Sequence, residues 1–341
     1  MKKKASTIKD IAQALNLNIS TVSRALNNSR KISDETKKLV QDYAEKVNYR
    51  PNAIASSLRM GRGNTIGLVV PRINRQFFSN LIYGVEEVLN SAGYNLLICQ
   101  SNELLENEKQ AINTLINARV DGIIISISKQ TASYKHLETV INRDIPLIQT
   151  DRVADLLPTN KIVNNNFKAS YIAVQHLLDS GYKRIAHISG PLAINIYKER
   201  LNGYTKAIED SRLSDKSPII FENIITDSEA YKLATGLISD KKMPDAFFAA
   251  SDFAALGILK ALKDNNIRVP DDVGIVGFAN EPFTEIISPA LTSFDQYSIE
   301  MGREAARILL DELENKQENR VPKQITIDPR LIVRESSIRR L

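Results

Sequence analysis

The chain has 341 residues, of which 43% are hydrophobic and 25% are charged, with a formal net charge of +5 at pH 7. This length is typical of two or three domains, and the composition is that of a globular protein rather than a disordered or fibrous one. No apolar run is long enough to span a membrane, polar residues follow the basic residues 1–4 where a signal peptide has an apolar core, and the single cysteine, Cys99, excludes an intramolecular disulfide. These features predict a cytoplasmic protein with no membrane partner.

The positive charge is concentrated near the N-terminus. Residues 1–63 hold 13 Lys and Arg against 5 Asp and Glu, a net charge of +8, whereas the rest of the chain holds 32 against 35, a net charge of −3. A basic block on a nearly neutral body is typical of nucleic-acid binding. A solvated basic tail is the alternative interpretation, but apolar residues at helical spacing within the block favour a folded module.

Three short helices are predicted in residues 1–50. The first follows Thr7, an N-cap residue with Asp10 three positions later, the second begins near Ile19 or Ser20, and the third follows Ser33. Their expected buried residues are Ile8, Ile11, Ala12, Leu15, Val22, Ala25, Leu26, Leu39, Val40, Tyr43, Ala44 and Val47. The tight turn between the first two helices predicts a helix-turn-helix domain over 1–50. Residues 51–63 then form a hinge and linker, in which a two-turn helix is too short to be stable alone.

From residue 65 onward, short β-branched runs alternate with longer amphipathic runs. Strands are predicted at 66–70, 95–99, 122–127, 146–149, 185–189, 246–249 and 273–277, and helices at 78–92, 106–117, 168–180, 201–210, 228–238, 253–264 and 299–314. This alternation predicts parallel sheets with helices on both faces, and the length predicts two lobes with a ligand site between them. The N-lobe is expected at about 64–164 and 295–324, and the C-lobe at about 165–294 and 325–341.

Several motifs, in order along the chain, resemble those of one known family. They are TIKDIA at 7–12, STVSRALN at 20–27, YRPNA at 49–53, TIGLVVP at 65–71, DGII at 121–124, GP at 190–191, RLNGY at 200–204, SD at 251–252 and PALTS at 289–293. Together they resemble the LacI/GalR family of transcriptional repressors over essentially the whole chain. The resemblance implies an all-α helix-turn-helix domain followed by a two-lobed α/β effector-binding and dimerisation domain, similar to periplasmic binding proteins, with two doubly wound parallel sheets.

By this resemblance, the second helix enters the major groove of an operator. Arginine can bind guanine through two hydrogen bonds, and isoleucine can contact a thymine methyl group. The alternatives are a solvated charge for Arg24 and a core position for Ile19. The implied major-groove residues are Ile19, Ser20 and Arg24, and the implied phosphate contacts are Thr21, Ser23 and Asn27.

The resemblance also implies that the hinge becomes helical on the operator and enters the minor groove. Leu58 would wedge between base pairs, Ala55 would allow a close approach, and Arg59 would contact the narrow groove or a phosphate. The alternative for Leu58 is an apolar linker residue that packs on the larger domain.

The family's effector cleft combines an apolar or aromatic wall with charged groups. The implied effector-binding residues are Phe77, Phe78, Asp151, Arg200, Ile225, Ser251 and Asn280. A structural salt bridge is the alternative for Arg200, and an inter-lobe or helix-capping partner is the alternative for Asp151. Ala279 stands where many members carry Asp, so Asn280 is a partial substitute. Because an arginine is kept and a carboxylate is lost, a sugar acid is favoured over a neutral sugar.

Further departures concern other ligand classes. Ile225 stands where several members place a stacking aromatic residue, and Ile194 stands where purine-responsive members have a cation. Both argue against a purine effector.

The predicted function is therefore a sequence-specific transcriptional repressor, controlled by a small carbohydrate or sugar acid, that binds a pseudo-palindromic operator as a homodimer. The alternative is a sugar-binding protein of a transport system, against which the basic N-terminal helices argue. An enzyme is not expected, because the chain has no phosphate-binding loop, no GxGxxG motif and no Cys/His cluster with metal-ligand spacing. No cofactor or metal is predicted.

Overall fold

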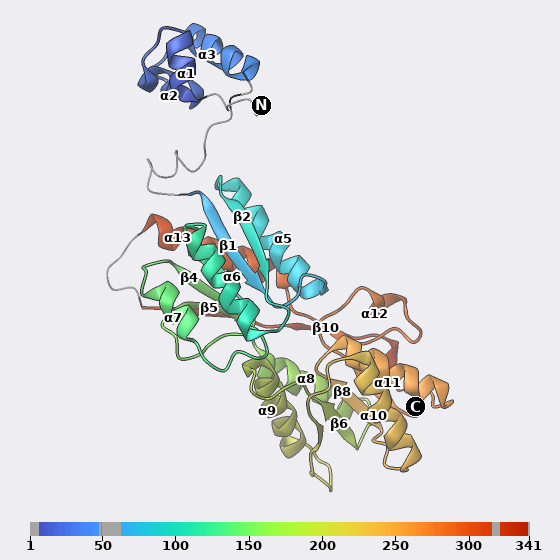
Figure 1. Ribbon diagram of the computed structural model, residues 1–341. Coiled ribbons are helices and arrows are strands. Elements are labelled where there is room, and N and C mark those ends of the chain that lie inside the picture. Colours follow the sequence, from blue (N-terminus) through green and yellow to red (C-terminus); the bar gives the residue numbers. More distant parts are fainter. Residues whose placement is uncertain (1–6, 48, 50–62, 316–320, 340–341) are drawn as a thin grey trace. The chain divides into compact units, whose positions relative to one another are not determined.

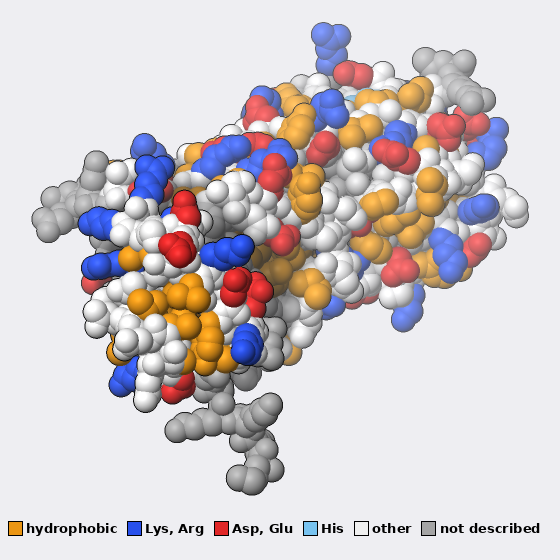
Figure 2. All heavy atoms as spheres, turned by 90° about the horizontal axis from the view of Figure 1, so that it is seen from above, with side chains coloured by type: hydrophobic (Ala, Val, Ile, Leu, Met, Phe, Trp, Pro, Cys, Tyr) orange, Lys and Arg blue, Asp and Glu red, His pale blue; other side chains and the backbone are white. Residues whose placement is uncertain are grey.

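The computed structural model describes residues 7–47, 49, 63–315 and 321–339 (Figure 1). The chain forms two compact units, Met1–Gly63 and Asn64–Leu341. Figure 2 shows that Lys, Arg, Asp and Glu side chains are interspersed on the face in view, with hydrophobic side chains gathered in smaller patches between them.

The N-terminal unit contains three described helices, α1 (Ile8–Ala14), α2 (Ile19–Leu26) and α3 (Asp34–Lys46). The predicted cap of α1 is confirmed, because the Thr7 hydroxyl accepts from the Asp10 backbone N–H and the Asp10 carboxylate accepts from the Thr7 N–H. Val22, Ala25 and Val40 are buried in the small core, and Leu26 is half-buried against it. The prediction that Leu39 is buried was wrong: its side chain is 51% exposed, one position off the stripe that Val40 and Ala44 form.

Left-handed asparagines end α1 and α2. Asn16 has φ 52° and Asn28 has φ 55°, a conformation that asparagine tolerates better than most residues. In each case the following N–H turns back to the helix: Leu17 donates to the Ala12 carbonyl (2.9 Å) and Ser29 to the Arg24 carbonyl (3.0 Å). These closures make the turns short and fix the angle at which α2 leaves α1.

The larger unit contains a first lobe built on a six-stranded sheet of order β11-β5-β4-β3-β1-β2, in which every neighbouring pair is parallel. Helices α5 and α13 cover one face and α6 and α7 the other, because alternate residues of β1 point to opposite cores. The elements are β1 (Thr65–Val70), α5 (Gln76–Ser91), β2 (Asn95–Gln100), α6 (Leu105–Asn117), β3 (Gly122–Ile125), α7 (Lys135–Ile141), β4 (Leu147–Thr150), β5 (Asn160–Asn164), α13 (Ser298–Glu314) and β11 (Gln324–Ile327).

A second lobe follows, on a four-stranded parallel sheet of order β7-β6-β8-β9. Helices α8 and α9 cover one face, and α10 and α11 cover the other. Its elements are α8 (Asn166–Asp179), β6 (Ile185–Ile188), α9 (Asn195–Asp210), β7 (Ile219–Phe221), α10 (Asp227–Ser239), β8 (Ala246–Ala249), α11 (Asp252–Asp264), β9 (Gly274–Val276), α12 (Phe283–Ile286) and η1 (Glu335–Ser337), with β10 (Ser293–Asp295) and β12 (Arg330–Ile332) forming a separate antiparallel pair. The predicted fold class, helices followed by a two-lobed α/β domain with parallel sheets, is confirmed.

The chain passes between the lobes after β5, near Gln296, and after β11 (Figure 1). The buried Asn164 side chain joins the three passages, because its amide group donates to the backbone carbonyls of Gln296 (3.0 Å) and Ile327 (3.4 Å). The last passage lies later than expected. Residue 325 was placed in the C-lobe, but β11 extends to Ile327 and pairs with β5.

Two helices that lie far apart in the sequence touch at their backbones. A Cβ atom on Gly84 of α5 would lie 2.0 Å from the Ile299 carbonyl oxygen, and one on Gly302 of α13 would lie 2.2 Å from the Leu81 carbonyl oxygen. No other residue type fits at either position, so the two glycines fix how closely α5 and α13 pack.

Candidate functional sites

The N-terminal unit exposes one face of α2. Ile19 is 43% exposed, and Ser20 and Arg24 are exposed, while Val22 and Ala25 on the opposite face are buried. The core interpretation of Ile19 therefore has no support. Ile19 begins α2 and Arg24 lies in its last turn, and an exposed isoleucine and an exposed arginine are side-chain types that read base edges.

The predicted phosphate contacts lie beside this face. Thr21 and Ser23 are half-buried, and Asn27 is exposed just after the end of α2. The predicted minor-groove residues Ala55, Leu58 and Arg59 lie outside the described residues.

The larger unit has a cavity of about 130 Å³ between its lobes. The first lobe contributes Arg72, Arg75, Phe77, Phe78, Glu103, Asp151 and Arg152; the second contributes Ile196, Tyr197, Arg200, Ile225, Ala250, Ser251, Phe253, Phe278, Ala279 and Glu281; and Gln296 lies between them. Most of these residues follow the carboxyl ends of strands, which is where parallel sheets place ligand sites. Six of the seven predicted effector-binding residues line the cavity, and Asn280 does not.

Arg200 is 4% exposed and is fixed by protein partners. Its Nε donates to the Asn166 side-chain oxygen (2.9 Å) and its Nη1 to the Ala250 carbonyl (2.8 Å), and its guanidinium carbon lies 3.6 Å from the centroid of the Phe278 ring. Burial lowers the pKa of Arg200 to about 10, against the opposing effect of Tyr197 and Asp151. No salt bridge of Arg200 is found among the described residues, so it is a positioned cation on an aromatic wall.

A cluster of charged side chains from the first lobe faces Arg200, and it consists of Arg152, Glu103 and Asp151. Arg152 donates from Nη1 to a Glu103 carboxylate oxygen (2.7 Å), and its Nε lies 3.9 Å from the Asp151 carboxylate. Burial raises the pKa of Asp151, with Arg152 and Arg200 opposing it. Burial also acts to raise the pKa of Glu103, but Arg152 and the backbone N–H of Lys129 outweigh it and lower that pKa.

The environment of Arg152 leaves one polar atom free. Its Nε is buried and has no hydrogen-bond partner. A buried donor without a partner is costly, which fits an atom that a ligand would satisfy. Asp151 itself has φ 61°, a left-handed conformation that aspartate tolerates, and this turn directs the chain into the cavity wall directly after β4.

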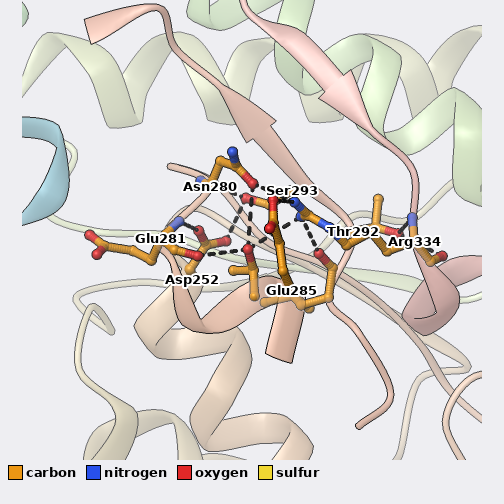
Figure 3. A network of polar contacts seen from close by, with 9 residues as sticks. Asp252, Asn280, Glu281, Glu285, Thr292, Ser293 and Arg334 are labelled. Carbon is orange, nitrogen blue, oxygen red and sulfur yellow. Dashed lines mark hydrogen bonds and ion pairs between the residues drawn. The ribbon is translucent and has the colours of Figure 1, made fainter. Parts of the chain in front are cut away.

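Asn280 was predicted to contact the effector, but its side chain binds another part of the protein instead. Figure 3 shows Asn280 turned toward Arg334, whose Nη2 donates to the Asn280 side-chain oxygen (2.9 Å) and to Glu285 (2.7 Å). The same guanidinium donates from Nη1 to the Thr284 hydroxyl (3.2 Å). The C-terminal segment thus holds the loop after β9, a long-range partner that no local pattern around residue 280 reveals.

This loop instead delivers a carboxylate from the next position. Ala279, with φ 124°, and Glu281 line the cavity, and Glu281 is 7% exposed. The Glu281 N–H is held by the Asp252 carboxylate (2.9 Å), whose pKa burial raises to about 6. The carboxylate lost at 279 is therefore replaced by one at 281.

Ser251, Ile225 and Ile194 differ in what they contribute to the cavity wall. Ser251 caps α11, and its hydroxyl also donates to the Ile225 carbonyl (3.4 Å). Ile225 lines the cavity, but Ile194 packs in a small apolar cluster with Ile196 and Tyr197. Ile194 does not line the cavity, so it gives no support to the argument against a purine effector.

Several polar residues of the cavity wall were not predicted from the sequence. With Gln296 between the lobes they number seven, the other six being Arg72, Arg75, Glu103, Arg152, Tyr197 and Glu281. Arg72 and Arg152 stand two residues after their strands, so a search for charged residues just beyond each strand end would have found them.

The histidines and the acidic residues suggest no further chemistry. His176 shares a hydrogen bond with the Ser337 hydroxyl (2.7 Å), a contact that joins α8 to the C-terminal segment. In the part of the chain that the structure describes, no three His, Cys, Asp or Glu residues are grouped so as to hold a metal ion. No helix among the described residues combines the length and apolar character needed to cross a membrane.

Comparisons with known proteins agree with this arrangement. Residues 7–52 match the family described as bacterial regulatory proteins, lacI family, and residues 174–337 match a periplasmic binding protein-like domain. The HTH-type transcriptional repressor PurR of Actinobacillus pleuropneumoniae serotype 3 (strain JL03) is 31% identical over 331 residues, which cover 97% of this chain and 98% of that protein.

Solved structures are similar over the same extent. A lac repressor dimer bound to operator and an anti-inducer has a TM-score of 0.86 at 22% identity, covering 98% of this chain and all of that one, which shows the fold. A complex of the transcriptional regulator CelR with cellobiose has a TM-score of 0.73 at 26% identity, covering 97% and 99%.

Proposed function

The chain belongs to the LacI family of bacterial regulatory proteins and is a DNA-binding transcriptional regulator with an effector-binding domain, and we propose that it is a homodimeric repressor whose operator binding is controlled by a small acidic carbohydrate. The observation that carries this proposal is the pairing of an exposed reading face on α2 with a separate, arginine-lined cavity. We place its action in the cytoplasm, where operator DNA is found. A transport protein has no use for the N-terminal unit, so that alternative is set aside.

The α2 residues Ile19, Ser20 and Arg24 are proposed to read base edges, and Thr21, Ser23 and Asn27 to contact phosphates. Their exposure on one helix face supports these roles. Two copies related by a twofold axis would read the two half-sites of a pseudo-palindromic operator. The PurR relative is a transcriptional repressor, which supports repression as the outcome.

The homodimer has support on the first lobe. Strand β2 is an edge of its sheet and carries exposed apolar side chains, Leu97 at 37% and Ile98 at 42% exposure, and Tyr83 of α5 is 57% exposed. Edge strands with apolar side chains are ordinarily covered by a partner. Light scattering on the purified chain should give twice the monomer mass; a monomer at micromolar concentration would contradict the proposal.

The cavity supports a small acidic ligand. Its volume of about 130 Å³ is close to that of an engineered cavity of about 150 Å³ that holds one benzene ring. Arg152 is paired with Glu103, which leaves Arg72, Arg75 and Arg200 facing the carboxylates of Asp151 and Glu281. The cavity therefore offers a net positive wall for a carboxylate and aromatic rings for the apolar face of a sugar.

DNA binding is tested with the upstream region of the protein's own gene as the probe. We expect specific binding that weakens steeply with salt, because phosphate contacts release counterions. Leu58→Ala, in the hinge, should keep the dimer and the effector site but lose specific operator affinity and DNA bending. Unchanged bending and affinity in that variant would remove the wedge role of Leu58.

The effector class is tested by calorimetry with D-glucuronate, D-galacturonate, D-glucose and the purine base adenine. We expect a uronate to bind about tenfold or more tightly than glucose, since a charge-assisted hydrogen bond contributes about 1.5–3 kcal/mol. Arg200→Met should abolish this preference, whereas the matched control Lys198→Met, exposed on the same helix, should keep it. Tighter binding of glucose or of adenine would refute the acidic effector.

A further inference from the structure

An arginine of the first lobe reaches the wall of the second. The guanidinium carbon of Arg75, just before α5, lies 3.8 Å from the centroid of the Phe253 ring, which belongs to α11. Both residues line the cavity. A cation over the face of an aromatic ring is attracted to it, and more strongly where water is excluded. This contact therefore joins the two lobes directly.

A carboxylate of the second lobe lies at the same place. Burial raises the pKa of Glu281, while the charge of Arg75 and the backbone N–H of Gln76 oppose that rise. Gln76 is the first residue of α5, and this helix has neither a side-chain cap nor an acidic residue in its first turn. A carboxylate near a helix N-terminus is stabilising. For α5, that carboxylate comes from the opposite lobe.

The second-lobe side of the contact is held firmly. The Phe253 ring packs edge-to-face on Phe283, with centroids 5.3 Å apart. Phe283 begins α12, and Arg334 binds the next part of this helix through Glu285 (2.7 Å). Figure 3 shows Glu281 and Glu285 within the same network of polar contacts. Arg75 therefore packs on a surface that these contacts hold in place.

We propose that Arg75, Phe253 and Glu281 form an inter-lobe latch that holds the two lobes together across the cleft. The latch deepens the function proposed above, on which its regulatory meaning rests, because a ligand that enters the cavity must separate or rearrange these side chains. Arg75 is a positioning residue of this latch: it acts by holding the second lobe against α5.

The test is hydrogen exchange on the full chain, free of DNA and ligand. Two segments are compared, residues 76–80 in the first lobe and residues 279–286 in the second. Arg75→Ala should speed exchange up to about tenfold in both segments, because the cation–π contact and the charge beside Glu281 are lost. Arg75→Lys keeps the cation and should give a smaller change. Arg143→Ala, an exposed arginine of the same lobe outside the cavity, should change neither segment.

A variant in the second lobe shows whether the effect crosses between the lobes or stays local to the mutated residue. Phe253→Leu keeps an apolar side chain in the second lobe, yet it should speed exchange at residues 76–80 of the first. If Arg75→Ala changes only its own helix start, or if Phe253→Leu leaves that start unchanged, the latch is wrong. DNA and effector are absent from this experiment, so its failure leaves the proposed repressor function standing, and failure of operator binding leaves the latch standing.

Discussion

The two functional regions of this protein hold their polar side chains in opposite ways. On α2, Ile19, Ser20 and Arg24 are exposed, and the Arg24 side chain has no hydrogen bond or ion pair among the described residues. In the cavity, Arg152 and Arg200 are less than a tenth exposed, and each is fixed by protein partners. The comparison teaches that the exposed side chains of α2 can change at little cost to folding, whereas Arg152 and Arg200 also support the fold that presents them.

The largest expected effect comes from breaking the buried pair of the cavity. Glu103→Ala leaves the buried Arg152 guanidinium with only the longer contact to Asp151 (3.9 Å), and removing the near partner of such a pair costs about 3 kcal/mol in the free energy of unfolding. Urea unfolding followed by far-ultraviolet circular dichroism measures the change, since the chain has no tryptophan.

The matched control for this pair is an exposed one. Glu106→Ala removes a carboxylate that is 81% exposed and paired with Lys109, so it should cost at most about 0.5 kcal/mol. Equal costs for the two variants would contradict the contrast between the regions.

The next effect belongs to the exposed region. Arg24→Ala should weaken binding to a specific operator by about 2 kcal/mol and relax the preference for one base, because a bidentate contact to guanine is lost. The melting temperature should stay at the wild-type value. Lys38→Ala, an exposed cation of α3, should leave base preference unchanged, and a loss of stability in Arg24→Ala would show that the arginine also holds the fold.

The smallest effect is a difference in pH dependence. His187 of β6 is buried between the rings of Tyr204 and Phe248, and burial lowers its pKa to about 3. The unfolded chain takes up a proton at His187 near pH 6.5 and the folded chain does not. Stability is therefore lost as pH falls from about 6.5 toward 3, by at most about 1.4 kcal/mol per pH unit.

His187→Phe should remove this part of the slope between pH 7 and pH 5. Unfolding midpoints of the two proteins over that range measure it, and parallel curves would contradict it. The N-terminal unit contains no histidine, so exchange of its amides should change in the same way with pH in both proteins.

The sequence predicted the fold class well because its elements carry strong periodicity. The strand at 246–249 and the helix caps at Thr7 and Ser33 lie where they were expected. The strand Asn160–Asn164 was missed, because its Asn and Lys residues hide a fully buried parallel strand. Strand β7 and the pair β10 and β12 are only three residues long, too short for a periodic signal.

The cavity was predicted less completely than the fold. Phe77, Phe78, Asp151 and Arg200 were placed in it through family motifs. Asn280 was misplaced because Arg334, 54 residues away, decides where its side chain points. Partners so distant are brought together by the tertiary fold alone.

The glycine contact between α5 and α13 sets how a signal can leave the cavity. Because the backbones touch at Gly84 and Gly302, neither helix can slide past the other without a steric clash. The start of α5 carries Arg75, and the start of α13 lies at the passage near Gln296. A ligand that displaces the first turn of α5 must therefore move α5 and α13 together. In the homodimer proposed above, a joint movement of α5 and α13 would reach the partner over many contacts at once.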